Sequence, residues 1–267
     1  MALLTLTNLY KTFEKGSINE NPVLRGLDLE IEQEDFISVI GGNGAGKSTL
    51  MNSIAGVVEI DDGDILLDGE SIKKASVSDR SKDISRVFQD PRMGTATNLS
   101  IEENMAIAYR RGKKRSIFKR SITEEERDLF KKELKHLGLG LENRMKTDAN
   151  FLSGGQRQAL TLAMATLVRP KVLLLDEHTA ALDPKTSDMV MNLTRKVVEE
   201  QKLTTLMVTH NMEHAIEYGN RLIMLFQGKI VVDVKGEEKR SLTVAQLMDL
   251  FHKNSGHRLN DDALVLS

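Results

Sequence analysis

The chain has 267 residues, of which 40% are hydrophobic and 28% charged, a size that allows one large α/β domain or a domain with a subdomain. Its formal net charge of −2 at pH 7 provides no electrostatic case for a nucleic-acid partner. It contains no cysteine, which excludes disulfides, thiolate metal sites and a cysteine nucleophile and fits a cytosolic protein.

The N-terminal region is predicted to form two half-buried strands, because residues 3–9 and 23–31 each alternate apolar and polar side chains. Tyr10 follows the first of these strands. Its ring is able to stack on a nucleotide base, but taken alone the residue favours simple packing in the sheet.

The strongest motif is a glycine-rich segment that fits the phosphate-loop pattern G-x-x-x-x-G-K-[ST] at every fixed position. A buried strand is predicted before it at 36–40 and a helix after it at 50–55, which is the context the motif requires. The glycines turn N–H groups inward at a helix N-terminus, the lysine adds a charge for the β- and γ-phosphates, and the serine offers a hydroxyl to Mg²⁺. The flanking elements argue against a plain glycine-rich turn. We therefore predict a nucleoside triphosphate site formed by Gly41, Gly42, Asn43, Gly44, Ala45, Gly46, Lys47, Ser48 and Thr49.

The chain changes character after two short predicted strands at 65–67 and 84–88. Ser100-Ile101-Glu102-Glu103 fits a capping box that opens a helix, and Thr123-Glu124-Glu125-Glu126 begins another. We interpret residues from about 92 to 168 as a helical subdomain inserted into a nucleotide-binding core.

A basic run at residues 110–120 contains seven basic residues and no acid. Such a run is usually a solvated loop, and the alternative is that it faces phospholipid head groups or an acidic partner. Its basic residues are Arg110, Arg111, Lys113, Lys114, Arg115, Lys119 and Arg120.

Strands and helices alternate in the second half of the chain. The apolar runs at 171–175 and 204–208 are typical of buried strands in a parallel sheet, and 221–226 and 229–234 are also predicted strands. With the phosphate loop, this alternation predicts an open, mainly parallel sheet flanked by helices. A C-terminal helix is expected over 243–253, with an apolar face of Val244, Leu247, Met248 and Phe251.

Polar residues with phosphate-transfer chemistry lie at the ends of these strands. Asp176 is placed to hold Mg²⁺, usually through water, and the adjacent Glu177 is placed to deprotonate an attacking water. Gln89 can sense the γ-phosphate or Mg²⁺ from the end of its own strand. His210 can donate to the γ-phosphate, although a lone histidine is more often structural.

Residues 152–156, with the sequence Leu-Ser-Gly-Gly-Gln, can be read by themselves as a helix cap or as a second anion site at a helix N-terminus. Between the phosphate loop and the acidic pair, they resemble the signature motif of the ATP-binding-cassette (ABC) ATPases, and 178–183 resembles the D-loop of that family. The resemblance covers about residues 3–234 and six motifs in order. It implies an α/β P-loop NTPase fold of the ABC type, with an antiparallel β subdomain and the inserted α-helical subdomain. We expect the ATPase domain to span 1–234 and residues 235–267 to form a helical extension of it.

The resemblance implies ATP and Mg²⁺ as cofactors. Tyr10 would stack on adenine, and the phosphate loop would cradle the phosphates. The residues that would bind or support Mg²⁺ are Ser48, Gln89 and Asp176. The catalytic residues it implies are Glu177 as general base, His210 as the switch histidine and Gln89 as the residue that reaches the attacking water.

The resemblance also implies a head-to-tail homodimer with two ATP molecules sandwiched between the subunits. Asp183 would help to couple the two sites. The signature residues that would touch the γ-phosphate bound to the other subunit are Ser153, Gly154, Gly155 and Gln156.

Three positions depart from the family pattern. Gly42 replaces the commoner proline or serine, Ala159 stands where the family has an arginine, although Arg157 lies nearby, and His178 replaces a frequent proline. None of these departures removes a catalytic group.

Two stretches, 90–105 and 176–186, resemble a bacterial subgroup of stand-alone importer ATPases. Such proteins work with a separate permease, similar to branched-chain amino acid permeases, and with a substrate-binding lipoprotein. We therefore expect an ATPase that energises import of a small solute, with amino acids among the candidates. An exporter ATPase, or a soluble ABC ATPase such as an iron–sulfur assembly factor, is the alternative.

The expected location is the cytoplasmic face of the plasma membrane, as a peripheral subunit without a nucleic-acid partner. No apolar run approaches the roughly 20 residues that a membrane-spanning helix needs, and the N-terminus lacks the pattern of a signal peptide. Another protein, the permease, is therefore expected to hold the chain at the membrane.

Overall fold

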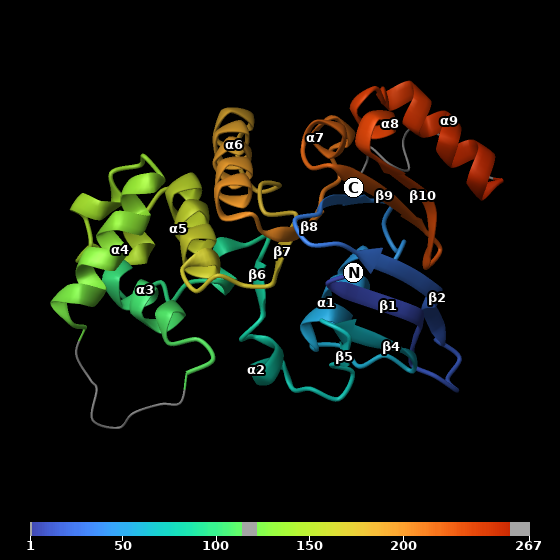
Figure 1. The fold of residues 1–267 in the computed structure, drawn as a ribbon, viewed down its shortest axis with the longest axis horizontal. Helices are drawn as coiled ribbons and strands as arrows, with labels where there is room; N and C mark the ends of the chain where they lie inside the picture. The colour runs from blue at the N-terminus through green and yellow to red at the C-terminus, as the bar shows by residue number, and fades with distance from the viewer. Residues whose placement is uncertain (1, 114–121, 257–267) are drawn as a thin grey trace. The chain divides into compact units, whose positions relative to one another are not determined.

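A computed structural model describes residues 2–113 and 122–256. The chain divides into two compact units (Figure 1). Unit 1 consists of Met1–Arg80 and Leu203–Ser267, and unit 2 consists of Ser81–Lys202. No helix among the described residues is long and apolar enough to cross a membrane.

The first sheet of unit 1 is antiparallel, with the strand order β2-β1-β4-β5. Alternate residues in the second half of β2 are buried, because successive side chains of a strand point to opposite faces of the sheet. The apolar residues of the alternating sequence therefore line the buried face. Both predicted N-terminal strands are confirmed, and each extends beyond its predicted range. The strands are β1 (Leu4–Phe13), β2 (Asn21–Ile31), β4 (Asp62–Leu67) and β5 (Glu70–Ser71).

The second sheet of unit 1 is mainly parallel, in the order β10-β9-β3-β8. The strand β3 (Phe36–Ile40) pairs in parallel with both β8 (Thr204–Val208) and β9 (Arg221–Phe226), while β10 (Lys229–Lys235) is antiparallel to β9. Every residue of β3 and β8 is buried, so their continuous apolar runs match strands that are covered on both faces. The helices of this part of the chain are α1 (Lys47–Ala55), α2 (Val77–Arg80) and α7 (Met212–Glu217).

Unit 2 combines a parallel strand pair with a group of helices. The strand β6 (Ile84–Val87) pairs in parallel with β7 (Val172–Asp176). Ser100 and Thr123 open their helices with complete capping boxes, as predicted. The helices are α3 (Ile101–Tyr109), α4 (Glu124–His136), α5 (Gly154–Thr166) and α6 (Pro184–Gln201), and three 3-10 turns, Pro91–Met93, Leu141–Asn143 and Ala149–Phe151, connect elements.

The described part of the basic run is tied to its own unit. Arg111 donates to the carbonyls of Ala165 at 3.1 Å, in the last turn of α5, and of Val168 at 2.5 Å, just beyond it. Burial lowers the pKa of this guanidinium. Arg110 forms an ion pair with Glu126 at 3.1 Å. Two of the seven basic residues are therefore structural links within unit 2. Lys114, Arg115, Lys119 and Arg120 lie outside the described residues.

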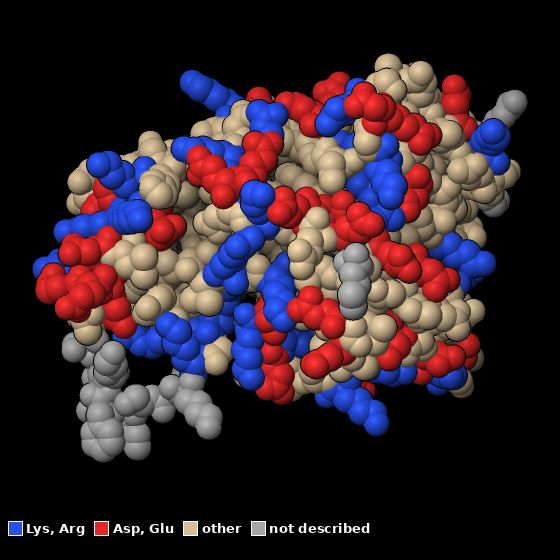
Figure 2. Space-filling model, in the orientation of Figure 1, with Lys and Arg blue, Asp and Glu red and all other residues tan. Residues whose placement is uncertain are grey.

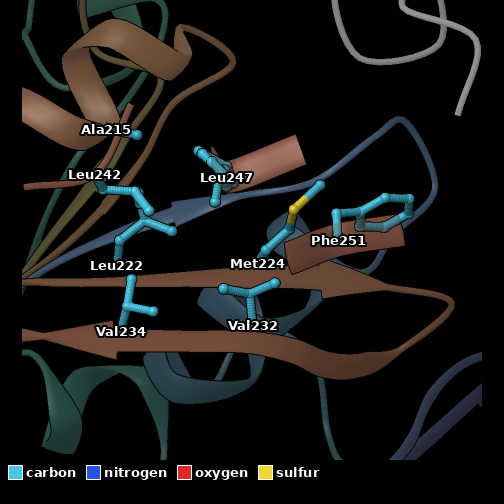
Figure 3. Close-up of a cluster of buried hydrophobic side chains, with 9 residues drawn as sticks. Ala215, Leu222, Met224, Val232, Val234, Leu242, Leu247 and Phe251 are labelled. Atoms are coloured by element: carbon cyan, nitrogen blue, oxygen red, sulfur yellow. The ribbon is translucent and has the colours of Figure 1, made fainter. Parts of the chain in front are cut away.

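The C-terminal helices α8 (Gly236–Arg240) and α9 (Val244–Ser255) cover one face of the sheet formed by β9 and β10 (Figure 1). Leu247 and Phe251 of α9 are fully buried against Leu222, Met224 and Val232 (Figure 3). The predicted apolar face of this helix is therefore confirmed at these two positions and at Met248, which packs against the same cluster. The prediction was wrong for Val244, which is 38% exposed because it starts the helix before the helix reaches the sheet.

Lys239 adds a polar link between α8 and the end of α7. Its side chain is 2% exposed, and its ammonium donates to the carbonyls of Ile216 at 2.6 Å and of Tyr218 and Gly219 at 2.9 Å each. Carbonyls at a helix C-terminus carry partial negative charge, so a cation there is stabilising. Burial nevertheless lowers the pKa of Lys239 to about 8, below the ordinary 10.5.

Lys239→Met is expected to lower the free energy of unfolding by about 2 kcal/mol near neutral pH, because three carbonyls lose their donor. The pKa of Lys239 is about 8 in the folded protein and 10.5 in the unfolded chain. Between these two pH values the unfolded chain binds more protons, so the contribution of Lys239 to the free energy of unfolding rises with pH. The advantage of the unaltered protein over the variant should therefore grow across that window. Urea unfolding at several pH values measures both effects, with the exposed Lys229→Met as the control. A pH-independent difference would contradict the lowered pKa.

Candidate active site

The predicted phosphate loop lies in unit 1, between β3 and α1. Gly41, Gly44 and Gly46 have φ values of +152°, +75° and +107°, as predicted from their place in the motif. A Cβ added at Gly41 would lie 2.4 Å from the carbonyl oxygen of Leu225, so only glycine lets the loop approach β9 this closely. No side chain caps the start of α1, and its first N–H groups are therefore suited to bind a phosphate.

Lys47 is the cation of this loop. Its side chain is buried, and its ammonium donates to the carbonyl oxygens of Gly41 at 2.7 Å and Gly42 at 3.3 Å. These contacts fix a positive charge against the same loop whose N–H groups form the anion nest. The hydroxyl-bearing Ser48 follows it on the first turn of α1 and is exposed.

Two further predicted residues lie in unit 1. Tyr10, on β1, is 41% exposed, and its hydroxyl oxygen lies 2.8 Å from where a Cβ on Gly26 would be. The tip of its ring thus lies beside a glycine, and the side chain stays partly exposed. His210 is exposed at the end of β8, and the next residue, Asn211, caps α7 by accepting from the N–H of His214 at 2.8 Å.

The acidic pair lies in unit 2, at the end of β7. Asp176 forms an ion pair with Arg86 of the neighbouring strand β6. Glu177 has a φ of +44°, a conformation that costs a non-glycine residue about 1 kcal/mol or more. The backbone therefore leaves the extended conformation of β7 at Glu177.

His178 anchors the segment that directly follows Glu177. It is 2% exposed, and its Nε2 lies 3.0 Å from the hydroxyl of Thr194 on α6. The same hydroxyl donates its single hydrogen to the carbonyl of Val190 at 2.9 Å, so Nε2 of His178 is the donor to Thr194. By sequence, His178 is the first residue of the D-loop segment and replaces a frequent proline, whereas the buried Thr194 gives no signal.

The signature segment begins α5 and forms a helix cap. Ser153 accepts from the N–H of Gln156 at 3.3 Å, and the Gln156 side chain accepts from the N–H of Ser153 at 3.2 Å. A Cβ on Gly155 would lie 2.4 Å from the Cγ2 of Thr186, so glycine is required where α5 meets the start of α6. The exposed Ser153 and Gly154 are the members of the motif that remain open to a ligand.

Arg157, two residues before the departure at Ala159, contacts the segment that precedes the signature motif. Its guanidinium donates to the carbonyls of Ala149 at 3.1 Å, Asn150 at 3.0 Å and Leu152 at 3.1 Å. These bonds fix the segment that enters the signature motif.

The last two predicted residues, Gln89 and Asp183, lie at or next to the N-terminal caps of helical segments. Gln89 is exposed just after β6, and the next residue, Asp90, caps the 3-10 turn Pro91–Met93. Asp183 caps α6 by accepting from the N–H of Thr186 at 3.1 Å, and hydrogen bonds from the side chain and the N–H of Thr186 hold the pKa of its carboxyl below the usual range. The D-loop acid therefore has a structural role of its own.

Each catalytic motif follows the carboxyl end of a parallel strand, which is where ligands bind in open α/β sheets. In unit 1 the phosphate loop follows β3 and His210 follows β8. In unit 2, Gln89 follows β6, and Asp176 with Glu177 ends β7. Unit 1 brings together the phosphate loop, Tyr10 and His210, while unit 2 holds Gln89, the signature residues, the acidic pair and Asp183.

The residues present fit a Mg²⁺–ATP complex. Carboxylate, hydroxyl and amide oxygens are the ligands that Mg²⁺ accepts in nucleotide sites, and each unit offers such groups, Ser48 in unit 1 and Gln89 and Asp176 in unit 2. Lysines and arginines are interspersed with acids over the face seen in Figure 2, without a broad basic patch there. In unit 1, the phosphate loop and Lys47 are the groups suited to bind phosphate.

Comparisons with known proteins agree with these motifs. The model of the ABC transporter family matches residues 24–180. The chain is 45% identical over 249 residues to the tyrosine transport ATP-binding protein of Clostridioides difficile, covering 93% of this chain and 98% of that protein. It is 32% identical over 267 residues to the phosphonates import ATP-binding protein PhnC of Lactobacillus johnsonii, covering 98% of this chain and 100% of that protein.

A solved structure shares the fold. The post-hydrolysis dimer of the ATP-binding cassette MJ0796, bound to ADP and Pi, has a TM-score of 0.73 and 29% identity, over 87% of this chain and 98% of that one. The family model covers more than half of the sequence, including the phosphate loop, the signature and the acidic pair. This chain therefore belongs to the ABC transporter family, as an ATP-binding ATPase subunit.

Proposed function

We propose that this protein hydrolyses ATP to drive import of a small solute through a separate membrane permease. The observation that carries the proposal is the complete set of motifs in one chain, with Lys47 held in its loop and Glu177 directly after the acid that ends β7. Its relatives that are named for transport and import support import over export or a soluble role such as iron–sulfur assembly.

The proposed chemistry assigns each motif a task. Tyr10 stacks on adenine, and the backbone N–H groups and Lys47 hold the phosphates. Ser48, Gln89 and Asp176 would hold Mg²⁺, which would supply charge neutralisation at the phosphates. Glu177 takes the proton of the attacking water as general base, because it directly follows the acid that ends β7. His210 donates to the γ-phosphate and Gln89 orients the water.

The functional unit in this proposal is a homodimer with two sandwiched ATP molecules. Ser153 to Gln156 of one subunit contact the γ-phosphate held by the other, and Asp183 couples the two sites. The exposure of Ser153, Gly154 and Asp183 supports this assignment. The ATPase domain spans 1–234, with the helical subdomain at about 92–168, and 235–267 is its extension.

The proposed partners are a permease, which holds this peripheral subunit on the cytoplasmic face of the plasma membrane, and a substrate-binding lipoprotein. An amino acid, tyrosine among the candidates, is the proposed solute. The 45% identity to the tyrosine transport protein of Clostridioides difficile supports an amino acid more than the 32% identity to PhnC supports a phosphonate.

Copurification from detergent-solubilised membranes of the host tests this function. The tagged chain should carry a multi-spanning permease with it, and the complex in proteoliposomes should hydrolyse ATP faster when the binding lipoprotein and tyrosine are added. A phosphonate in place of tyrosine is the matched control for the solute. Recovery of soluble partners alone would overturn the transport role, whereas stimulation by the phosphonate alone would overturn only the amino acid.

A further inference from the structure

Arg86 and Asp176 form an ion pair whose position follows from the register of unit 2. In the parallel pair of β6 and β7, Arg86 lies opposite Leu174, and Asp176 is two residues further along β7. Residues two apart point to the same face of a strand, so the two side chains are diagonal neighbours on one face. Their side chains are only 14% and 16% exposed, which limits the solvent screening of the pair.

The guanidinium of Arg86 is also held by a ring. Its Cζ lies 4.8 Å from the centre of the Phe88 ring, and Phe88 is two residues further along the chain, directly after β6. A cation over an aromatic face gains further stabilisation. The guanidinium of Arg86 therefore contacts both the Phe88 ring and the Asp176 carboxylate, and these two contacts fix its position.

Asp176 is the carboxylate that the proposed function assigns to the support of Mg²⁺. A carboxylate that already accepts a charge-assisted hydrogen bond from arginine has less negative potential to offer a second cation. A metal ion that uses Asp176, directly or through water, shares this group with Arg86 or displaces it.

We propose that Arg86 is a positioning residue that acts as a built-in counterion of Asp176 and lowers the affinity of the site for divalent metal. It holds the acidic side chain in place and makes metal binding depend on the phosphates that the nucleotide brings. This inference rests on the proposed role of Asp176 and adds to it a residue that no motif of the sequence includes.

Binding of Mn²⁺, measured by electron paramagnetic resonance in the presence of the non-hydrolysable analogue AMP-PNP, tests the proposal without turnover. Arg86→Met should bind Mn²⁺ about tenfold more tightly, the scale expected when one charge-assisted hydrogen bond no longer competes. Arg86→Lys, which keeps the charge, should stay near the unaltered protein. Arg86→Gln also removes the charge while keeping a donor, and it replaces the methionine variant if that variant does not fold.

Two controls separate the possible failures. Arg127→Met removes another ion pair of unit 2, with Glu102 at 3.0 Å, and should leave Mn²⁺ binding unchanged. Asp176→Asn should weaken Mn²⁺ binding. If it does so while the Arg86 variants bind Mn²⁺ no more tightly than the unaltered protein, Arg86 is only a structural link and the inference is wrong. If Asp176→Asn leaves binding unchanged, the proposed metal role of Asp176 is wrong instead.

Discussion

Glu177→Gln is expected to bind ATP as tightly as the unaltered protein and to hydrolyse it at least about a hundredfold more slowly, the scale attributed to a general base. The amide has the shape of the carboxylate, so the left-handed backbone at position 177 and the buried His178 behind it are retained. What the substitution removes is the group that accepts a proton from water. Equilibrium binding of a fluorescent ATP analogue and single-turnover release of phosphate measure the two properties separately.

The matched control for this variant is Glu200→Gln, an exposed acid on α6 of the same unit, which should change neither property. Because ATP persists in the Glu177→Gln protein, MgATP should also convert it to a dimer, which light scattering detects. Multiple turnover at the normal rate would place the base elsewhere. A monomer at saturating MgATP would count against the sandwich of two nucleotides.

Lys47→Ala is expected to weaken ATP binding by about ten- to a hundredfold, because a charged hydrogen-bond donor to the phosphates contributes about 1.5–3 kcal/mol. The ammonium has a second role in the structure, since it donates to Gly41 and Gly42 of its own loop. The alanine variant therefore changes the loop as well as the charge. Isothermal titration calorimetry measures the affinity, and urea unfolding measures the stability.

Lys47→Met separates the two effects, because it keeps the buried apolar stem of the side chain and removes only the charge. Most of the affinity should still be lost in this variant. If both variants bind ATP with the original affinity, the loop is not the phosphate cradle. If only the alanine variant loses affinity, the packing of the loop accounts for binding and the charge does not.

The sequence alone predicted the elements whose cause is local. The phosphate loop, the capping boxes at Ser100 and Thr123 and the buried strands β3 and β8 depend on neighbouring residues, and the structure places them as predicted. Short helices such as α7 and α8 were missed, because one or two turns are too short for an apolar period to be recognised. The signature segment fits both a helix cap and an anion site by sequence; the structure shows the cap, and its contact with a γ-phosphate stays a prediction.

Only the tertiary structure decided which distant residues serve the predicted ones. Arg86 meets Asp176 through the register of two strands that are far apart in sequence, and Thr194 meets His178 through the packing of α6. Lys239 is buried against the end of α7, although its own sequence is that of a charged, exposed helix. Local pattern fixes secondary structure and motif, whereas the partner of a polar side chain depends on burial and on contacts between remote segments, which no local pattern encodes.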